Sequence, residues 1–596
     1  MTRNEAPATT NYYALSSAAH LAPSVSVVAA LARLVPLMAE ERRTVGLAVL
    51  AITVSSLTSL FAPVIISRTV DIDIQNRNFA GVLQWSAILL VVFFIGLVAT
   101  YFQTQRMGTV GRRVLFKLRN SLFTKLQELP VDFFNQNKAG DLISRINNDT
   151  DKLNQFFAQS LVQLASNLFL MVGAIIFILT LNFRLGVAAL MPAVGVLIFS
   201  QLISGWVRRK NVKSLQSLGS VSAEIQESLS HFKVIVAFNR RDYFRQKFDE
   251  ANQRNFSASV GAGLASNIFV PVYGLAFNLA QLVVLTYGVY LMSAGNLTVG
   301  VLIGFLMYVN SFYMPLRQLA AVWSSFQLAL AGLDRISSVL ALKSNMPTMT
   351  ADTTATGGAV LEFEGVSFTY PGGTHVLTDA TFKLERGRTY ALVGPTGGGK
   401  TTTASLMARL YDPSGGRVLL DGLDIRTYQP DRRTKKIGFI LQEPFLFTGT
   451  IRENILYGNT QYLSATDDQI RSLLSERNLD SLLTRFEQGL DTKVTTGGDA
   501  ISLGQKQLIA FMRAVLRDPE ILVLDEATAN IDTVTEQLLD EILTKLPSST
   551  TKVIIAHRLN TIANADEIFF INSGEIIPAG SMEHAVEMLL HGKRAS

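Results

Sequence analysis

The chain has 596 residues, of which 48% are hydrophobic and 17% are charged, and it contains no cysteine. The lack of cysteine excludes disulfide frameworks, thiolate catalysis and Cys-ligated metal sites. The apolar excess excludes a disordered chain and is unusual for a soluble protein, in which about a quarter of residues are charged. The net charge of +6 suits either nucleic acid or a membrane, and the positions of the charges distinguish the two.

The N-terminal region predicts a tail and a surface helix. Residues 1–24 are polar and lack the apolar core of a signal peptide, so we expect a flexible tail. Residues 26–38 are amphipathic and predict a helix lying on the inner leaflet, at the start of a transmembrane domain spanning residues 25–340. A disordered tail throughout this region is the alternative.

Six apolar runs follow, each long enough to cross a bilayer core, which requires about 20 residues. None has an acidic residue or a lysine in its interior, which favours membrane spans over buried helices of a large soluble protein. The predicted spans are residues 44–66, 82–104, 158–181, 185–207, 264–292 and 298–322.

The basic residues concentrate in two long connections, between spans two and three and between spans four and five. The other connections contain only Arg68, Arg77 and Arg184. By the positive-inside rule the two basic connections, and with them both termini, face the cytoplasm. The positive charge therefore reflects the orientation of the chain in the membrane, and we expect the lipid bilayer rather than nucleic acid as the partner. The apolar spacing within both connections predicts that the membrane helices continue into the cytoplasm.

The polar segment 341–358 predicts a linker to a second domain, residues 359–596, which has the pattern of a soluble α/β protein. Residues 360–370 and 389–393 predict strands. The next residues, Gly394 to Thr401, follow the pattern G-x-x-x-x-G-K-[ST] between a strand and a helix. In such a loop backbone N–H groups surround phosphates, Lys400 supplies a positive charge, and Thr401 can bind Mg²⁺.

A second element, which is acidic, strengthens the interpretation of residues 394–401 as a phosphate-binding loop. Residues 521–524 predict a buried strand that ends in Asp525 and Glu526. An acid at a strand end beside a phosphate loop can anchor Mg²⁺, and we assign that role to Asp525. We expect Glu526 to polarise the attacking water.

Between these elements, Ile501-Ser502-Leu503-Gly504-Gln505 precedes a helix predicted over residues 506–517. Here the chain resembles the ATP-binding cassette (ABC) family, whose signature is an LSGGQ-type sequence. The resemblance implies ATP hydrolysis coupled to transport, with ATP and Mg²⁺ as cofactors and Lys400, Glu526 and His557 as catalytic residues. It also implies nucleotide or metal contacts from Tyr370, Gly394, Pro395, Thr396, Gly397, Gly398, Gly399, Lys400, Thr401, Thr402, Gln442, Ser502, Gly504, Gln505 and Asp532, with Thr401, Gln442 and Asp525 at the metal.

The membrane half resembles the six-span exporter branch of that family. Phe133-Phe134, Gly140-Asp141 and Arg145 resemble its first intracellular loop, and residues 233–238 resemble its second coupling region. Ala329, Gly332, Arg335 and Ile336 resemble the exit from the sixth span. The fold class is therefore multidomain: an all-α six-helix transmembrane domain followed by an α/β P-loop nucleotide-binding domain. The resemblance implies coupling helices that rest on both nucleotide domains of a dimer.

The chain departs from the family pattern at the signature. Leu503 replaces the first glycine of the Gly-Gly pair, and a leucine side chain crowds an approaching phosphate. Thr496 stands where many members have a glutamate, and the D-loop reads Ala529-Asn530-Ile531-Asp532. This resembles one subunit of a heterodimeric exporter with one competent and one degenerate site. A homodimer that tolerates Leu503 is the alternative.

The cargo is not named by the sequence. We expect efflux of amphipathic or hydrophobic drugs or lipids across a bacterial plasma membrane; lipid flipping, peptide export, siderophore-like uptake and a gated channel are alternatives. The following residues of spans five and six are candidates to line the cavity, with helix packing or lipid contact as the alternative: Asn278, Gln281, Phe305, Tyr308, Asn310 and Phe312.

Overall fold

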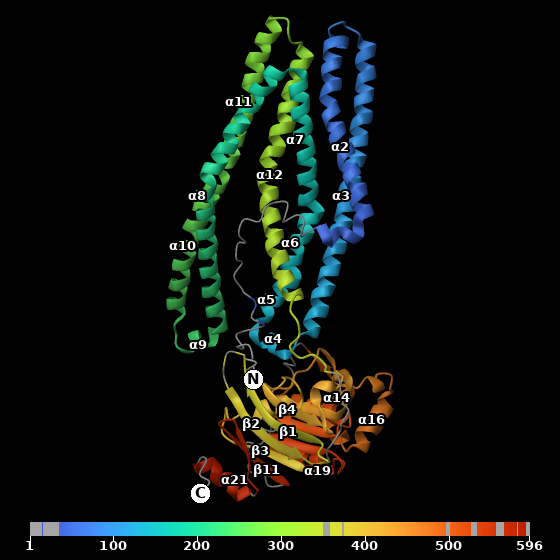
Figure 1. Cartoon of the computed structure of the whole chain (residues 1–596), viewed down its shortest axis with the longest axis vertical. Helices are drawn as coiled ribbons and strands as arrows, with labels where there is room; N and C mark the ends of the chain where they lie inside the picture. Colours follow the sequence, from blue (N-terminus) through green and yellow to red (C-terminus); the bar gives the residue numbers. More distant parts are fainter. Residues whose placement is uncertain are drawn as a thin grey trace, which may run out of the picture. The chain divides into compact units, whose positions relative to one another are not determined.

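The computed structural model of the chain describes residues 13, 15, 35–349, 358–371, 373, 375–495, 501–525, 533–555, 565–580 and 582–591. The chain divides into two compact units. The helical unit contains Ser17–Lys125 and Gly140–Ala341, and the α/β unit contains Met1–Ser16, Leu126–Ala139 and Leu342–Ser596. Figure 1 shows the long helices of the first unit and the strands of the second.

The helical unit is built from long helices joined by short turns. In chain order they are η1 (Val35–Glu41), α2 (Arg42–Arg68), η2 (Thr69–Ile74), α3 (Phe79–Glu128), α5 (Ala139–Ser144), η3 (Arg145–Asp149), α6 (Thr150–Gln155), η4 (Phe156–Ser160), α7 (Leu161–Leu181), α8 (Phe183–Ser230), α9 (Phe232–Ala237), α10 (Arg241–Asn267), α11 (Phe269–Ser293) and α12 (Val299–Leu340).

Among the described residues, six helical segments are long and apolar enough to cross a membrane. Five predicted spans lie within one of them each, and the sixth begins one residue before its segment, so the six-span prediction is confirmed. The segments are longer than the apolar runs, as expected for helices that continue beyond the bilayer. They are Pro36–Ile74, Phe79–Glu128, Ala139–Leu181, Phe183–Ser230, Arg241–Ser293 and Val299–Leu340.

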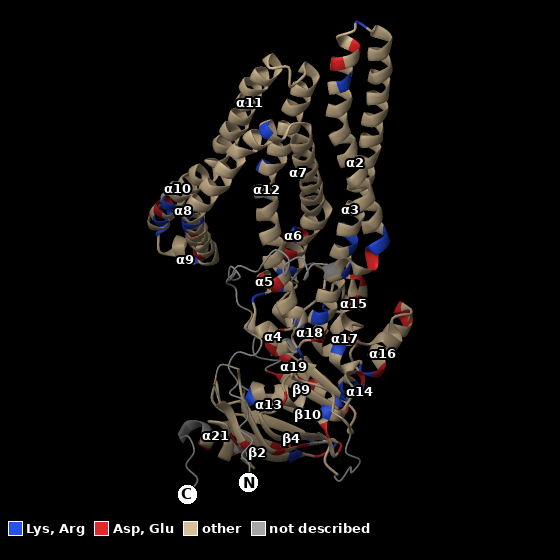
Figure 2. Cartoon of the chain, turned by 45° about the horizontal axis from the view of Figure 1, so that its top comes forward, with Lys and Arg blue, Asp and Glu red and all other residues tan. Residues whose placement is uncertain are grey.

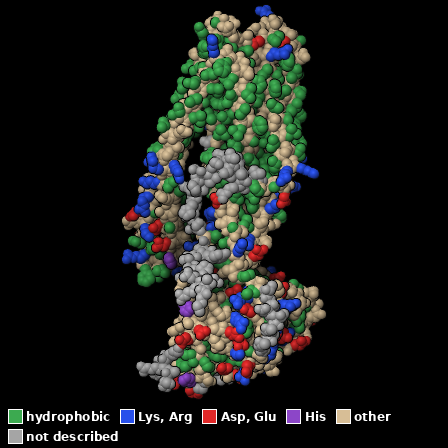
Figure 3. Space-filling view, in the orientation of Figure 1, with side chains coloured by type: hydrophobic (Ala, Val, Ile, Leu, Met, Phe, Trp, Pro, Cys, Tyr) green, Lys and Arg blue, Asp and Glu red, His purple; other side chains and the backbone are tan. Residues whose placement is uncertain are grey.

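Side-chain chemistry changes along these helices. Hydrophobic side chains cover one end of the helical unit, whereas Lys, Arg, Asp and Glu gather over the other end, around α8 and α10 (Figures 2 and 3). An exposed apolar surface of this extent needs lipid or another protein surface to cover it.

The core of the helical unit corrects part of the cavity prediction. Phe305, Tyr308 and Phe312 are buried in a cluster with α2, α7, α8 and α11. The Tyr308 hydroxyl donates to the backbone oxygen of Leu60 at 2.6 Å, and its ring stacks on Phe177 with centroids 5.0 Å apart. These three side chains pack helices together, because aromatic rings bury large apolar areas efficiently. The remaining cavity candidates are less enclosed: Asn278 and Asn310 are exposed and Gln281 is half-buried.

A partly buried charged cluster joins the segment after α4 (Val131–Gln136) to the end of α12. Arg145 donates to Asp141 Oδ2 at 2.9 Å and to the backbone oxygen of Arg335 at 2.8 Å. Arg335 in turn bonds Asp141 at 2.7 Å and lies 3.0 Å from Asp149. A Cβ at Gly332 would lie 3.0 Å from the Asp149 oxygen, so this close approach favours glycine. The structure thus brings together residues predicted for the first intracellular loop and for the exit of span six.

The α/β unit holds two main sheets. A mixed sheet has the order β12-β11-β3-β10-β9-β6, with β12 alone antiparallel, and an antiparallel sheet has the order β2-β1-β4-β5. A third sheet pairs β7 with β8. The strands are β1 (Leu361–Thr369), β2 (His375–Leu384), β3 (Thr389–Val393), β4 (Gly415–Leu420), β5 (Leu423–Asp424), β6 (Ile437–Ile440), β7 (Gly449–Thr450), β8 (Lys493–Val494), β9 (Ile521–Asp525), β10 (Thr551–Ile555), β11 (Glu567–Asn572) and β12 (Glu575–Pro578).

Strands β3 and β9–β11 form a near-continuous apolar interior, as parallel strands covered on both faces do. Helices and short helical turns complete the unit. These are α4 (Val131–Gln136), α13 (Lys400–Met407), η5 (Ile425–Thr427), α14 (Pro430–Lys436), α15 (Ile451–Ile455), η6 (Thr460–Tyr462), α16 (Asp467–Glu476), α17 (Asp480–Leu483), η7 (Gly489–Asp491), α18 (Leu503–Val515), α19 (Thr533–Lys545) and α21 (Met582–His591).

Several boundaries differ from the prediction. Helix α18 begins at Leu503 rather than at residue 506, because Ser502 supplies its N-cap. Residues 126–139, predicted within the transmembrane domain, belong to the α/β unit. The expected flexible tail is wrong at Tyr13, which is fully buried. Most of the expected surface helix, residues 26–34, and most of the linker, residues 350–357, lie outside the described residues.

Candidate active site

Several of the predicted site residues lie where parallel strands end. The phosphate loop follows β3, Asp525 closes β9, and Gln442 lies two residues after β6. Strand β10 pairs with both β3 and β9, and β9 pairs with β6, all in parallel. The carboxyl ends of these strands therefore share one edge of the sheet, which is where open α/β sheets bind their ligands.

The backbone of the loop before α13 requires glycine. Gly394, Gly397 and Gly399 have φ values of 148°, 81° and 116°. A Cβ on Gly394 would lie 2.0 Å from the Ile571 oxygen, and a Cβ on Gly398 would lie 2.6 Å from the same atom. Side chains are thus excluded at Gly394 and Gly398, and a loop without side chains there lets a phosphate approach the backbone closely.

Lysine and threonine stand at the start of α13. Lys400 is buried, and its Nζ donates to the backbone oxygens of Gly394 at 2.9 Å and Pro395 at 3.0 Å. These bonds hold the ammonium group over the loop. The N-terminus of the helix adds a partial positive charge at the same place, which favours an anion.

The donor set fits Mg²⁺. Thr401 Oγ1 donates to Asp525 Oδ1 at 3.1 Å, and Asp525 is buried at the end of β9. A hydroxyl and a carboxylate oxygen from different elements are the hard ligands that Mg²⁺ prefers in combination with phosphate oxygens. Gln442 is exposed and starts its loop at the same sheet edge.

The aromatic residue expected at adenine belongs to a cluster of three rings. Tyr370 follows β1, and its hydroxyl lies 3.0 Å from Thr402 Oγ1 on α13. Its ring meets Tyr411 edge-on at 5.4 Å and Phe368 at 4.8 Å. Burial raises the pKa of the Tyr411 phenol above its ordinary value. The cluster fixes the Tyr370 ring relative to the phosphate loop.

The signature opens α18 in a different part of the unit. Ser502 Oγ accepts from Gln505 N at 3.2 Å, and Gln505 Oε1 accepts from Ser502 N at 3.0 Å, which is a capping box. Gln505 also donates to the Arg485 oxygen at 3.0 Å. Leu503 and Ser502 are exposed, and Gly504 is half-buried. The structure places these residues with the helices α15–α18 rather than with the phosphate loop.

Three of the predicted residues, Glu526, Asp532 and His557, lie outside the described residues, as does Thr496.

Sequence reasoning missed two supporting residues. Tyr411 stands in Tyr-Asp-Pro-Ser-Gly-Gly, a turn sequence shortly after the phosphate-loop helix, and this signal could have suggested a residue near the nucleotide. Arg513 on α18 donates to the oxygens of Asn454 at 2.8 Å and Phe445 at 3.2 Å, and it lies over the Tyr457 ring. It connects the segment after Gln442 to the signature helix. Burial lowers the Arg513 pKa, yet a guanidinium remains charged.

Comparison with known proteins assigns both halves of the chain. Residues 45–316 match the family described as ABC transporter transmembrane region, and residues 377–529 match the family described as ABC transporter. The chain is 35% identical to the uncharacterized ABC transporter ATP-binding protein YfiC of Bacillus subtilis, over 92% of this chain and 91% of that protein. It is 32% identical to the fatty acid ABC transporter ATP-binding/permease protein of Mycobacterium tuberculosis, over 85% and 80%. It is 30% identical to the putative multidrug export ATP-binding/permease protein YgaD of Bacillus subtilis, over 89% and 92%.

The matches and the geometry agree on one assignment. The described residues contain six long apolar helical segments followed by a phosphate loop at the end of parallel strands, and the two family matches fall in the same order. The chain therefore belongs to the ABC transporter family, as a multi-pass membrane protein of the exporter type that couples ATP hydrolysis to transport.

Proposed function

We propose that this chain is one half of a two-subunit exporter that moves amphipathic or hydrophobic compounds out across the plasma membrane by alternating access. The observation that carries the proposal is the Thr401–Asp525 contact beside the glycine-lined loop, in a chain that also has six apolar helices. Relatives named for fatty acids and for multidrug export support cargo of this class.

Each site residue has a proposed role. Residues 394–402 and Tyr370 bind the phosphates and the adenine, and Lys400 neutralises the transferred phosphate. Thr401, Asp525 and Gln442 would hold Mg²⁺, which when bound neutralises charge developing on the phosphate oxygens. Glu526 accepts the proton of the attacking water, and His557 positions the terminal phosphate. Asp532 and the signature residues Ser502, Gly504 and Gln505 contact nucleotide across the subunit boundary.

Two exposed apolar sites support a second subunit. Phe232, Val234 and Phe238, in or beside α9, are exposed, with Phe238 75% exposed. A separate aromatic patch on the α/β unit contains Phe445, Phe447 and Tyr457. Exposed apolar clusters of this kind mark binding surfaces. We propose that α9 docks on the α/β unit of the partner, and that the partner's matching segment docks on the aromatic patch.

The partner is proposed to be a different chain. Leu503 occupies the first turn of α18, where its exposed side chain would meet a phosphate approaching the helix N-terminus. The phosphate-loop half of this chain retains the expected residues. This asymmetry favours pairing with a chain that has an intact signature and a substituted catalytic acid. A homodimer with Leu503 in both sites is the second candidate, and lipid flipping or peptide export by the same motor are alternative activities.

The orientation follows from charge. The polar ends of α8 and α10 bear clustered Lys and Arg, which supports a cytoplasmic location for α9 and for both termini (Figure 2).

The motor assignment is tested with Glu526→Gln in the complex purified from its native membrane and reconstituted in lipid vesicles. We expect ATP turnover to fall by about 100-fold or more, with ATP binding retained, because the general base is lost while the binding groups remain. Glu541→Gln, at an exposed ion pair with Lys545, is the matched control and should leave turnover unchanged. Turnover within a few-fold of the wild type would refute the role of Glu526.

The partner assignment is tested by native mass spectrometry of the same complex. We expect one copy of this chain with one different chain of similar mass. A single species with two copies of this chain would instead establish the homodimer.

A further inference from the structure

The N-terminal segment contributes a buried side chain to the α/β unit. Tyr13 has no exposed surface, although it lies in a polar tail more than 300 residues before its neighbours in the linker. Its ring packs edge-on against Phe133 of α4, with centroids 6.1 Å apart. A fully buried tyrosine at this position loses much conformational freedom, so its contacts must offset that cost.

The Tyr13 hydroxyl is bonded to the start of the linker. It accepts from the backbone N of Asn345 at 2.7 Å. Its single hydrogen lies between two acceptors, Asn345 Oδ1 at 2.9 Å and the Lys343 backbone oxygen at 3.2 Å. Three polar atoms of the linker therefore converge on one phenol.

The backbone around Tyr13 is bonded to the residue that ends α4. Asn137 Nδ2 donates to the Tyr13 oxygen at 2.9 Å, and Asn137 Oδ1 accepts from Leu15 N at 3.0 Å. One asparagine side chain thus satisfies both a donor and an acceptor of the segment, as in the pairing of two strands. Tyr13 therefore bridges α4 and the linker, and Leu15 adds a second bond to the end of α4.

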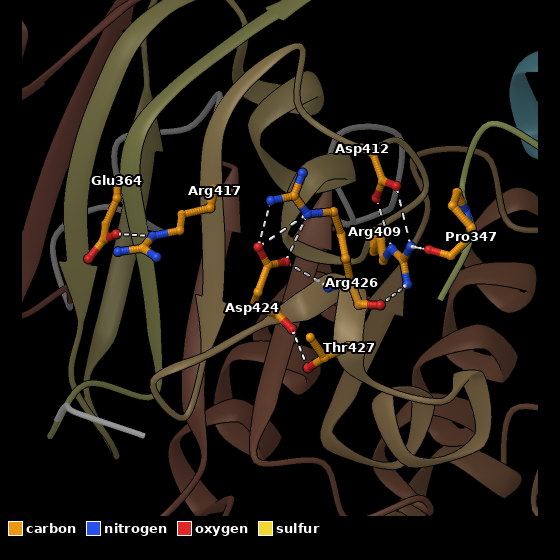
Figure 4. Close-up of polar contacts among 8 residues, drawn as sticks. All are labelled: Pro347, Glu364, Arg409, Asp412, Arg417, Asp424, Arg426 and Thr427. Carbon is orange, nitrogen blue, oxygen red and sulfur yellow. Dashed lines mark hydrogen bonds and ion pairs between the residues drawn. The ribbon is translucent and has the colours of Figure 1, made fainter. Parts of the chain in front are cut away.

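The other end of the described linker is fixed to the α/β unit by a buried arginine. Arg409 Nη2 donates to the Pro347 oxygen at 2.9 Å, and its Nε bonds Asp412 at 2.8 Å (Figure 4). The Met349 N–H donates to the Arg426 oxygen at 2.9 Å. Residues 343–349 are therefore held at both ends, by Tyr13 and by Arg409.

The same neighbourhood touches the ring cluster of the nucleotide site. Tyr411 is two residues after Arg409, and its hydroxyl accepts from Asn135 Nδ2 of α4 at 2.6 Å. Tyr411 supports Tyr370, which is bonded to Thr402 of α13. A continuous set of contacts runs from Tyr13 through α4 to the residue proposed to stack on adenine.

We propose that Tyr13 and Leu15 form a latch, the Tyr13 latch, that clamps α4 to the linker and thereby positions the Tyr370–Tyr411 pair for ATP. Tyr13 is a positioning residue and touches no nucleotide. The inference rests on the proposed roles of Tyr370 and α4. It adds that the N-terminal segment sets nucleotide affinity and the transmission of motion through α4.

The first test measures hydrogen–deuterium exchange of the full complex in lipid nanodiscs. In Tyr13→Ala we expect exchange in residues 131–137 and 343–349 to accelerate about 10-fold, because the bridge between them is lost. In Tyr13→Phe, which keeps the ring but leaves the Asn345 amide without its partner, we expect a smaller acceleration of about 3-fold. Tyr243→Phe, an exposed tyrosine on α10, is the matched control and should change neither region.

The second test separates positioning from folding. Tyr13→Phe should raise the KM for ATP about 3-fold while leaving kcat within 2-fold, and Asn345→Ala should have a smaller effect, because alanine keeps the backbone N–H that donates to Tyr13. The double variant should be no worse than Tyr13→Phe alone, because the bond lost in Asn345→Ala is already lost in Tyr13→Phe. A proportional fall of kcat with unchanged KM would indicate lost active protein instead, and would overturn the positioning role.

Failure of the latch is distinguishable from failure of the nucleotide-site assignment. Unchanged exchange in residues 131–137 of Tyr13→Ala would overturn the latch. Tyr370→Ala tests the other premise, and an unchanged KM for ATP there would refute adenine stacking by Tyr370. Accelerated exchange in Tyr13→Ala with an unchanged KM would overturn the link between latch and nucleotide.

Discussion

The two short helices α4 and α9 have similar lengths and both contain phenylalanine and branched apolar residues, yet their environments differ. Phe133 of α4 is fully buried, and Asn135 and Asn137 are bonded within the α/β unit. Around α9 only Ile235 is buried, and Phe232 and Phe238 are exposed. The contrast teaches that one short helix is covered by its own chain, whereas the other has an exposed apolar surface that a second chain could cover.

The largest effect that would sharpen this contrast is expected for Phe133→Ala. Removing a fully buried ring from the interface of α4 with Tyr13 should destabilise the α/β unit by about 3–4 kcal/mol. Thermal unfolding of the purified chain measures it. Phe134→Ala, at the exposed neighbouring position, is the control and should cost less than about 1 kcal/mol. Equal costs would mean that α4 is not seated as described.

The opposite pattern is expected at α9. Phe238→Asp combined with Val234→Asp places charges on an exposed surface, so the unfolding midpoint of the uncomplexed chain should change by less than about 1 °C. In the assembled complex, the stimulation of ATP turnover by cargo should fall about 10-fold, because buried unpaired charges weaken the proposed docking. Lys233→Asp, a charge change at an exposed position of the same helix, is the control for general electrostatic effects. If cargo still stimulated ATP turnover in the double variant, the exposed surface of α9 would not be a docking site, and the contrast with α4 would be wrong.

The smallest effect concerns pH. Burial raises the pKa of Asp132 on α4, which lies near Tyr411 and accepts from Gln136 at 2.8 Å. A carboxyl group whose pKa is raised on folding stabilises the fold below its unfolded pKa, and that contribution is lost as pH rises through the folded value. Asp132→Asn should therefore raise the unfolding midpoint by about 2 °C at pH 7, with the gain shrinking towards pH 4. If the gain in unfolding midpoint instead grew as the pH fell, the pKa of Asp132 would be lowered rather than raised on folding.

The parts of the chain that were predictable depend on local rules. Gly394 to Thr401 and Asp525 could be assigned because phosphate binding demands fixed residue types at fixed spacing, and the structure brings Thr401 and Asp525 together. The spans could be predicted because a bilayer demands long apolar runs. The start of α18 was misplaced because Ser502 caps the helix, and its capping partner Gln505 was assigned to the signature instead.

Other features depend on contacts between distant segments. Nothing in the polar tail around Tyr13 indicates that Phe133 and Asn345 enclose it. Phe305, Tyr308 and Phe312 were candidates for the cavity because their composition suits cargo and packing equally, and only the neighbours in three dimensions decide. The position of residues 126–139 in the α/β unit likewise reflects tertiary contacts that no local pattern encodes.

The capping box at Ser502 has a consequence for how two subunits separate. Its hydroxyl and the Gln505 amide are already bonded to each other's backbone, at 3.2 and 3.0 Å. A phosphate brought by a second subunit would therefore replace existing hydrogen bonds rather than satisfy free groups, and the net gain per exchange is only about 0.5–1.5 kcal/mol. The first turn of α18 thus has a stable arrangement of its own without any ligand, so contacts with the second subunit proposed above would be readily reversible.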